Sequence, residues 1–305
     1  MDQRKLEHFL AVIEHGQFNL AAAANGVSQQ AISKAIAKLE TELDVKLFER
    51  NALGATPTIY AKALEGRAQS ILAETRLATA ELNALSGAVL GTLNIGVGLA
   101  AARRIVPKAI HAFRAQRPGI GISATVEPAT TLYGKLLRGE LDLVISPLPD
   151  GASVDPQIET TPLFTDTDRP MVGGKHPLAV AKRVTMADLA VHTWIAPRYN
   201  AAIWFEICHA FAAARLAPPA DVIRTDSMPL ALGLLENENC IAMMGAETMT
   251  PEITAARIKV LEVPGLALKR QTHLATRRAA KLSPTAKAFV PFVQEMCRGR
   301  QSRGA

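Results

Sequence analysis

Polar side chains recur at helical spacing between residues 28 and 38, and their chemistry is suited to reading DNA. Amide and ammonium groups can hydrogen-bond to base edges in the major groove, whereas hydroxyl and ammonium groups commonly bind phosphates. The expected base contacts are Gln29, Gln30 and Lys34, and the expected phosphate contacts are Ser28, Ser33 and Lys38. On an arbitrary amphipathic helix such a face is more often simply solvated, so the elements around it must decide.

Those elements predict a helix-turn-helix over residues 19–39. Ser28 is a good N-cap for the polar helix, and its buried side would be supplied by Ala31, Ile32, Ala35, Ile36 and Leu39. A short Ala-rich helix is expected over residues 19–25, with Asn19 as its N-cap, and Gly26 can adopt the positive φ of a tight turn. A packing helix over residues 5–15, stopped by Gly16, precedes both. This spacing is typical of a DNA-reading motif.

A small wing is expected directly after this motif. The sequence VKLFERNALGATPT alternates short apolar runs around a turn at residues 51–54. Arg50 at the base of the wing would suit phosphate or minor-groove contact, and Thr56 or Thr58 would return from the wing.

A long helix is predicted over residues 58–85, which contain no proline and one glycine. Apolar and small residues step alternately by four and three, as the seam of a two-stranded coiled coil requires; they are Leu64, Ala68, Ile71, Thr75, Ala78, Leu82 and Leu85. This seam predicts a dimer. The alternative is that it is the buried stripe of a helix packed on its own domain.

Beyond Gly91 the pattern changes to alternating strands and helices. Strands are expected at residues 92–98, 120–126 and 141–146, with helices over 103–116 and 132–139 between and beside them. A second set begins at about Asp166 and ends with a helix over 283–297. The alternation favours an α/β domain with a mostly parallel sheet, in two lobes with a cleft between them.

Composition bounds the class of protein without settling it. The chain has 305 residues, 49% of them apolar and 20% charged, with a net charge of +6. Residues 1–86 carry nine Lys/Arg against ten Asp/Glu, so the predicted DNA-binding region is not basic overall. No apolar run approaches the roughly 20 residues of a membrane span, and no signal peptide precedes the first helix, so we expect a cytoplasmic protein with no membrane partner.

The chain resembles the LysR-type transcriptional regulators over its full length. The signature is FLAVIEHGQFNLAAAANGVSQQAISKAIAKLETELDVKLFER, with the family's residues at fixed offsets. The resemblance implies an α/β multidomain fold: a winged helix-turn-helix at 1–57, a linker helix and hinge at 58–90, and a periplasmic-binding-protein-like effector domain at 91–305. Lobe I would comprise about 91–165 and 271–305, and lobe II about 166–270.

Two departures from the family pattern are notable. Gln30 stands where the family usually has proline, and it adds an amide able to make a bidentate contact to adenine. Pro57-Thr58 and Ala61 stand where Leu-Thr and then Gly are usual. The first departure predicts an altered base preference.

The resemblance also implies effector contacts at strand ends, namely Ala100, Thr130, Thr131, Ser146, Pro147, Arg198, Ser227 and Met244. Arg198 is the one cationic candidate among them, and a guanidinium can bind a carboxylate with two parallel hydrogen bonds. This predicts a small organic acid as effector. The alternative is that Arg198 belongs to a surface loop.

The resulting hypothesis is a transcriptional regulator that is not an enzyme. The sequence lacks GxSxG, HExxH, Walker and GxGxxG motifs, and Cys208-His209 would point about 100° apart on a helix. No cofactor and no metal site is expected. Expected partners are promoter DNA, further copies of the chain as a dimer and a homotetramer, and the effector, and the resemblance also allows RNA polymerase. The alternatives are a ligand-independent regulator and a redox-responsive one, for which Cys208 has no nearby cysteine in the sequence, the next being Cys240.

Overall fold

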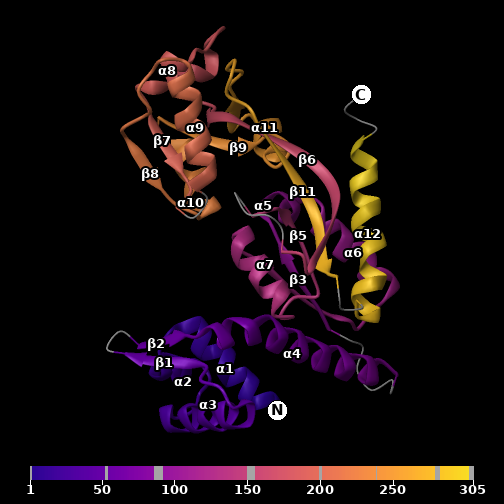
Figure 1. Cartoon of the computed structure of the whole chain (residues 1–305). Coiled ribbons are helices and arrows are strands. Elements are labelled where there is room, and N and C mark those ends of the chain that lie inside the picture. Colours follow the sequence, from indigo (N-terminus) through magenta and orange to yellow (C-terminus); the bar gives the residue numbers. More distant parts are fainter. Residues whose placement is uncertain are drawn as a thin grey trace.

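The computed structural model describes residues 2–51, 54–85, 92–149, 155–198, 201–237, 239–278 and 282–301. The predicted domain boundary at Gly91 and the tip of the predicted wing lie outside these ranges. A helical N-terminal part is followed by the long helix α4 and then by an α/β part, as Figure 1 shows.

The N-terminal part contains α1 (Gln3–His15), α2 (Phe18–Ala24), α3 (Gln29–Leu43) and the hairpin of β1 (Phe48–Asn51) and β2 (Gly54–Pro57). The turn glycines have the expected left-handed backbone, with φ of 64° at Gly16 and 65° at Gly26. The expectation that Asn19 caps α2 is wrong, because the helix begins at Phe18 after Gln17. The buried Phe18 ring packs edge-on against Phe48 at a centroid distance of 5.9 Å, so burial rather than capping fixes this start.

One hydrophobic core unites these elements. Leu6, Phe9 and Val12 of α1 meet Ile32, Ile36 and Leu39 of α3. Ala31, expected on the buried side of α3, is exposed, because it lies one residue before the Ile32 position that faces the core.

The helix α4 (Ile59–Leu85) divides into two halves. Ala61, Ala68 and Leu72 are buried in the core of their own domain, with α1 packed against them. The later seam positions Ile71, Thr75, Ala78 and Leu82 are exposed, whereas the side chain of Leu85 lies outside the described residues. The predicted seam is therefore wrong at Ala68, where the packing on its own domain takes over.

The α/β part is built on one nine-stranded mixed sheet with the order β4-β3-β5-β11-β6-β9-β7-β8, and β10 beside β6. The strands are β3 (Thr92–Val97), β4 (Gly121–Val126), β5 (Leu143–Pro147), β6 (Ile158–Gly173), β7 (Thr193–Ala196), β8 (Val222–Arg224), β9 (Cys240–Gly245), β10 (Ile258–Val260) and β11 (Leu268–Arg277). Four of its eight pairings are parallel and four antiparallel, so the expectation of a mostly parallel sheet is wrong. The long strands β6 and β11 account for all the antiparallel pairings.

The helices of this part are α5 (Leu99–Arg104), α6 (Val106–Gln116), α7 (Ala129–Leu137), α8 (Met186–Ala190), α9 (Ala201–Ala213), α10 (Met228–Asn237), α11 (Thr250–Thr254), α12 (Pro284–Gln301) and the 3₁₀ turn Pro177–Val180. The single helix expected over 103–116 is in fact two, α5 and α6. Pro107 in the first turn of α6 has no N–H to continue the α5 ladder, which explains the break after Arg104.

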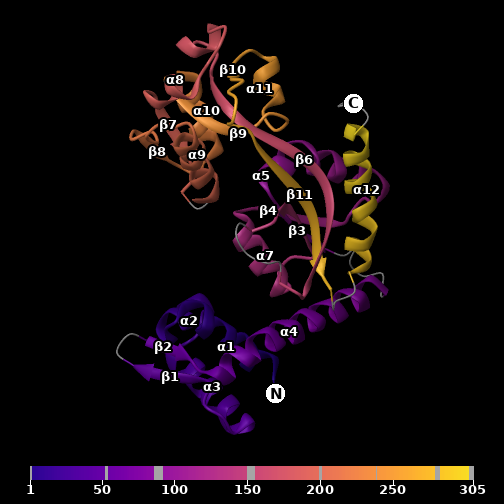
Figure 2. The ribbon, with the colours of Figure 1, turned by 45° about the horizontal axis from the view of Figure 1, so that its top comes forward.

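Two lobes follow from the strand pairings. Lobe I contains β3 to β5, α5 to α7, α12, and the part of the sheet in which β11 pairs with β5, from Thr272 to Ala275. Lobe II contains β7 to β10, α8 to α11, and the part in which β6 pairs with β9, from Asp168 to Val172. In both Figure 1 and Figure 2, lobe I lies between α4 and lobe II.

Lobe I touches the linker helix α4 at the corner after α7. Gly139 has φ of 68°, and a Cβ placed on it would lie 2.5 Å from both Ala73 Cβ and Arg277 Nη1. Arg76 Nη1 donates to the carbonyl oxygen of Arg138 at 3.2 Å. This contact therefore needs a residue without a side chain.

Within the described ranges, no helix has the length and apolarity required to cross a bilayer.

Candidate nucleic-acid interface and effector domain

The helix α3 separates a packing stripe from a polar face. Ile32, Ile36 and Leu39 are at most 2% exposed. The expected base contacts Gln29, Gln30 and Lys34 and the expected phosphate contacts Ser28 and Lys38 are exposed, and Ser33 is half-buried. Ser28 Oγ accepts a hydrogen bond from the Ala31 N–H at 3.2 Å, so the predicted N-cap is confirmed.

The neighbouring helices fix the orientation of α3. An ion pair joins Lys5 of α1 to Glu42 of α3, and the amide of Asn25 donates to Ala21 O at 2.9 Å to close α2. A helix held by its apolar stripe and by an ion pair in its last turn can present its polar face as a rigid surface.

The wing is held on the N-terminal part by its backbone. The Ala55 N–H donates to Gly16 O at 2.8 Å, and Arg50 faces Ala55 in the β1–β2 register. The Arg50 side chain lies outside the described residues. Thr58 is half-buried: its hydroxyl donates to Lys46 O at 2.7 Å and accepts from the Ala61 N–H at 3.3 Å, so the structure gives it the role of an N-cap for α4.

Glu40 is a residue of this region to which the sequence pattern assigned no role. Its carboxylate accepts hydrogen bonds from the N–H groups of Leu47 (2.8 Å) and Phe48 (3.3 Å) and from Lys46 Nζ (2.7 Å). Burial opposes its ionisation, but these hydrogen bonds together outweigh burial and lower the pKa of Glu40 below its ordinary value. Glu40 thus fastens the end of the recognition helix to the first strand of the wing.

All five of the expected effector contacts in lobe I lie near two helix starts. The Gly98 N–H donates to Ile145 O at 2.8 Å, and a Cβ on Gly98 would lie 2.9 Å from Ser146 Oγ, so the first turn of α5, with Ala100, lies beside the end of β5. Pro147 ends β5, and Thr130 and Thr131 are exposed on the first turn of α7.

The lobe II candidates divide into a surface pair and a buried residue. The backbone N–H of the exposed Arg198 donates to Asp226 Oδ1 at 2.9 Å. Ser227 follows Asp226 in the chain, and its hydroxyl accepts from the Leu230 N–H at 3.4 Å. Arg198 and Ser227 are thereby brought together. Met244 instead packs in a core cluster of lobe II, so an effector could reach its side chain only if that cluster opened.

Buried charges occur where β6 and β11 pass between the lobes. Asp168 is 1% exposed, and Arg270 Nε lies 2.7 Å from its Oδ2. That contact is out of hydrogen-bond alignment, and neither Asp168 oxygen accepts a hydrogen bond from a described residue. Burial raises the pKa of Asp168 to about 6, opposed by Arg270 and assisted by the nearby Asp166. In sequence the signal was the alternation of two aspartates, Asp166 and Asp168, directly before Arg169.

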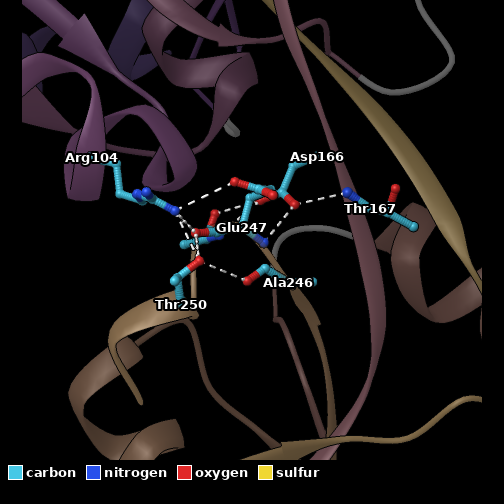
Figure 3. A network of polar contacts seen from close by, with 7 residues as sticks. Arg104, Asp166, Thr167, Ala246, Glu247 and Thr250 are labelled. Carbon is cyan, nitrogen blue, oxygen red and sulfur yellow. Dashed lines mark hydrogen bonds and ion pairs between the residues drawn. The ribbon is translucent and has the colours of Figure 1, made fainter. Parts of the chain in front are cut away.

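Asp166, on the same strand, organises the network shown in Figure 3. Its carboxylate accepts from the N–H groups of Thr167 (2.8 Å), Glu247 (3.1 Å) and Thr248 (3.2 Å), and from Thr248 Oγ1 (2.7 Å). The connection between β9 and α11 is thereby fixed to β6.

Among the described residues, no group of three or more His, Cys, Asp or Glu side chains is placed to hold a metal ion.

A winged helix-turn-helix with an exposed amide and ammonium face, joined to a two-lobed α/β domain, defines a DNA-binding protein with a regulatory domain. Comparison with known proteins identifies the family. The model "Bacterial regulatory helix-turn-helix protein, lysR family" matches residues 3–62, and "LysR substrate binding domain" matches residues 86–298.

Individual relatives agree. The SDS degradation transcriptional activation protein of Pseudomonas sp. is 29% identical over 297 residues, covering 94% of each chain. The HTH-type transcriptional regulator GbpR of Rhizobium radiobacter is 32% identical over 240 residues, or 78% of this chain and 79% of that protein. Full-length CbnR, solved in complex with its target DNA, has the same fold, with a TM-score of 0.57 at 23% identity over 97% of this chain and 100% of that one.

The chain therefore belongs to the LysR family of transcriptional regulators. It is a DNA-binding regulator with an effector-binding domain, and its relatives are regulators rather than enzymes.

Proposed function

We propose that this regulator reads promoter DNA through α3 as part of an oligomer and answers to a small organic acid bound between lobes I and II. The observation that carries the proposal is the division of α3, whose apolar stripe is buried while its amide and ammonium groups face solvent. In this scheme residues 1–57 bind DNA, residues 58–90 join two copies, and residues 91–305 bind the effector. The protein acts in the cytoplasm, where its DNA is.

Base readout is assigned to Gln29, Gln30 and Lys34, because their side chains are long, exposed and on one face of α3. Phosphate contact is assigned to Ser28, Ser33 and Lys38 on the same helix and to Arg50 and Thr58 at the wing. The internal hydrogen bonds of Thr58 support a positioning role for its hydroxyl beside any phosphate contact.

The second half of α4 supports self-association. Ile71 and Leu82 are 41% and 67% exposed, and Ala78 lies exposed between them on the same stripe. An exposed apolar stripe on a long helix is stabilised when a second helix covers it. We assign this stripe to the dimer contact, and two such dimers to a tetramer whose DNA-reading helices engage successive half-sites.

The effector assignment rests on Arg198 and Ser227 in lobe II and on Ala100, Thr130, Thr131, Ser146 and Pro147 in lobe I. Asp226 accepts from the backbone N–H of Arg198 and precedes Ser227, so a carboxylate ligand there would meet the Arg198 guanidinium and the Ser227 hydroxyl, opposed by the charge of Asp226. Calorimetry against a panel of small carboxylates tests this. We expect Arg198→Ala to lose the binding, whereas Arg215→Ala, an exposed arginine elsewhere in lobe II, should keep it. Wild-type affinity in Arg198→Ala would remove Arg198 from the site.

Mechanistically, an effector that binds one arrangement of the lobes better than another shifts the population toward that arrangement. Lobe I touches α4, so a change of arrangement reaches the linker helix and alters the spacing of the DNA-reading helices.

The deciding experiment is genome-wide mapping of bound DNA. The wild-type protein should give discrete promoter peaks, and the genes beside them should indicate the effector's pathway. A variant with Gln29→Ala, Gln30→Ala and Lys34→Ala should lose them, whereas the control Lys62→Ala, an exposed lysine on α4, should keep them. Unchanged peaks in the triple variant would refute the assignment of base readout to α3.

A further inference from the structure

Two consecutive arginines of lobe I reach across to lobe II. Arg103, in the last turn of α5, donates from Nη2 to Glu252 Oε1 at 2.5 Å and from Nη1 to Met249 Sδ at 3.6 Å. Glu252 is buried, and its other oxygen accepts no hydrogen bond from a described residue. Its charge is therefore compensated mainly from the other lobe, with Arg257 of its own lobe farther away at 3.6 Å.

Arg104 also binds lobe II, at the residues that lead into α11. Its Nη1 donates to Glu247 O at 3.0 Å and to Thr250 Oγ1 at 2.9 Å, and it lies 3.4 Å from Glu247 Oε2 (Figure 3). Arg104 thus binds the start of α11 through the backbone carbonyl oxygen of Glu247 and the side-chain hydroxyl of Thr250.

The gripped segment is itself fixed to lobe II from another direction. Asp166 accepts from the N–H groups of Glu247 and Thr248, and the Ala246 N–H donates to Thr167 O at 3.1 Å. There is no room for a Cβ at Gly245, which would collide with the Asp166 carboxylate. Because residues 246–248 are hydrogen-bonded to β6, a displacement of α5 that moves this segment would also move β6.

The arginines share a helix face with a residue assigned to the effector site. Ala100 lies three and four positions before Arg103 and Arg104, so all three occupy one side of α5. The first turn of α5 is beside Ser146 at the end of β5, and the last turn is on lobe II. One short helix connects the effector contact to the contact between the lobes.

We propose that Arg103 and Arg104 form an interlobe latch, a pair of positioning residues that hold α5 of lobe I on residues 246–252 of lobe II. The latch sets the separation of the lobes at the effector site. This inference rests on the proposed effector role of Ala100. An effector that displaces α5 acts directly on the latch and so on the arrangement of the lobes.

Hydrogen–deuterium exchange of the full-length, effector-free protein tests the latch. Glu252→Gln, a change in lobe II, should speed the exchange of α5 in lobe I by about fivefold or more, the lower end of typical coupling between sites. Arg103→Gln should in turn speed the exchange of α11. The strand β3 should exchange as in the wild type, because it takes no part in the latch.

The matched control is Arg169→Gln, which breaks an ion pair with Glu262 entirely inside lobe II. It should leave the exchange of α5 unchanged. Arg103→Lys keeps the charge opposite Glu252 and should restore most of the protection that Arg103→Gln loses. If Arg103→Lys and Arg103→Gln speed the exchange of α11 equally, charge pairing does not hold the lobes together and the latch is refuted.

Confinement of the Glu252→Gln effect to lobe II would equally overturn the proposal. If Glu252→Gln does not fold, Arg104→Gln at the partly exposed position provides the same comparison, with faster exchange at the start of α11 supporting the latch and unchanged exchange opposing it. These measurements use neither effector nor DNA. Their failure is therefore distinguishable from failure of the carboxylate titration or of the promoter mapping.

Discussion

Gln30 is the second residue of α3, where the backbone N–H has no partner within the helix and the side chain is exposed. We expect Gln30→Ala to change the preference among bases at one operator position by about 1–3 kcal/mol, the range for a bidentate base contact. Lys38→Ala should weaken binding to all sequences alike and reduce the salt dependence by about one phosphate contact. Binding titrations on a panel of operator variants measure both. Identical losses across the panel would contradict the division between base and phosphate contacts.

Glu40 acts through hydrogen bonds rather than through contact with DNA. Because its pKa is lowered in the folded state, its contribution to stability is present above the ordinary carboxyl pKa of 4.5 and is lost as the pH falls through the lowered value. We expect Glu40→Gln to reduce the free energy of unfolding at pH 7 by about 1–3 kcal/mol and to flatten its acid limb. Denaturant titrations between pH 3 and pH 7 would show this. Glu49→Gln, an exposed change on the wing, is the control and should have little effect.

The pKa of Asp168 is shifted in the opposite direction to that of Glu40. Its pKa rises from 3.8 to about 6 on folding, so stability falls as the pH rises through that window, and the full cost is present above it. Asp168→Asn should therefore raise the free energy of unfolding at pH 7 by up to about 3 kcal/mol and change nothing below pH 3. Arg270 is about one-third exposed and can be rehydrated. Glu159→Gln, an exposed change on the same strand β6, is the control, and a less stable Asp168→Asn protein would show that the Arg270 pair outweighs burial.

At the scale of elements, the two halves of α4 should respond differently to charge. Leu82→Glu places a carboxylate on the exposed stripe and should dissociate the oligomer without unfolding the N-terminal part, whose core lies against the first half of the helix. Light scattering gives the mass and circular dichroism the fold. Lys62→Glu on the same helix is the control and should keep the wild-type mass. An unchanged mass for Leu82→Glu would place the self-association elsewhere.

Local signals predicted the elements that depend on local physics. Ser28 as a cap, Gly16 and Gly26 as turn residues and the buried positions Ile32, Ile36 and Leu39 of α3 are confirmed, because capping and periodicity act within a few residues. Asn19 and the 103–116 helix were wrong, since burial of Phe18 and the missing N–H of Pro107 outweigh propensity.

The strand β6 was largely missed, and with it the mixed character of the sheet. It carries Pro162, Pro170 and two aspartates, which disguise a strand whose partners are supplied by β9 and β11. The same limit applies to sites. The polar face of α3 is readable from spacing, but the pairing of Arg103 with Glu252 spans 149 residues, and no local pattern indicates it.

At the scale of the whole molecule, the corner at Gly139 joins the effector domain to the linker helix. Gly139→Ala should force lobe I away from α4, because the new Cβ would lie 2.5 Å from Ala73 Cβ of α4. We expect a larger radius of gyration in small-angle scattering and a weaker transfer of the effector response to DNA. Gly265→Ala is the matched control, since its φ of 83° is equally unfavourable for alanine while nothing lies within 4 Å of the new Cβ. Equal changes in the two variants would mean that backbone strain, and not the contact with α4, is responsible.

The position of β11 in the sheet has a consequence for biosynthesis. This strand lies between β5 and β6, yet it is the last of the strands to leave the ribosome. The N-terminal part has its own core and can fold while later residues are still being made, but the sheet of lobe I closes only after Arg277 has emerged. A chain broken off anywhere between α4 and β11 would therefore retain a DNA-reading helix and an association surface while lacking a finished effector domain. Such a fragment would compete for the same promoters without responding to any signal.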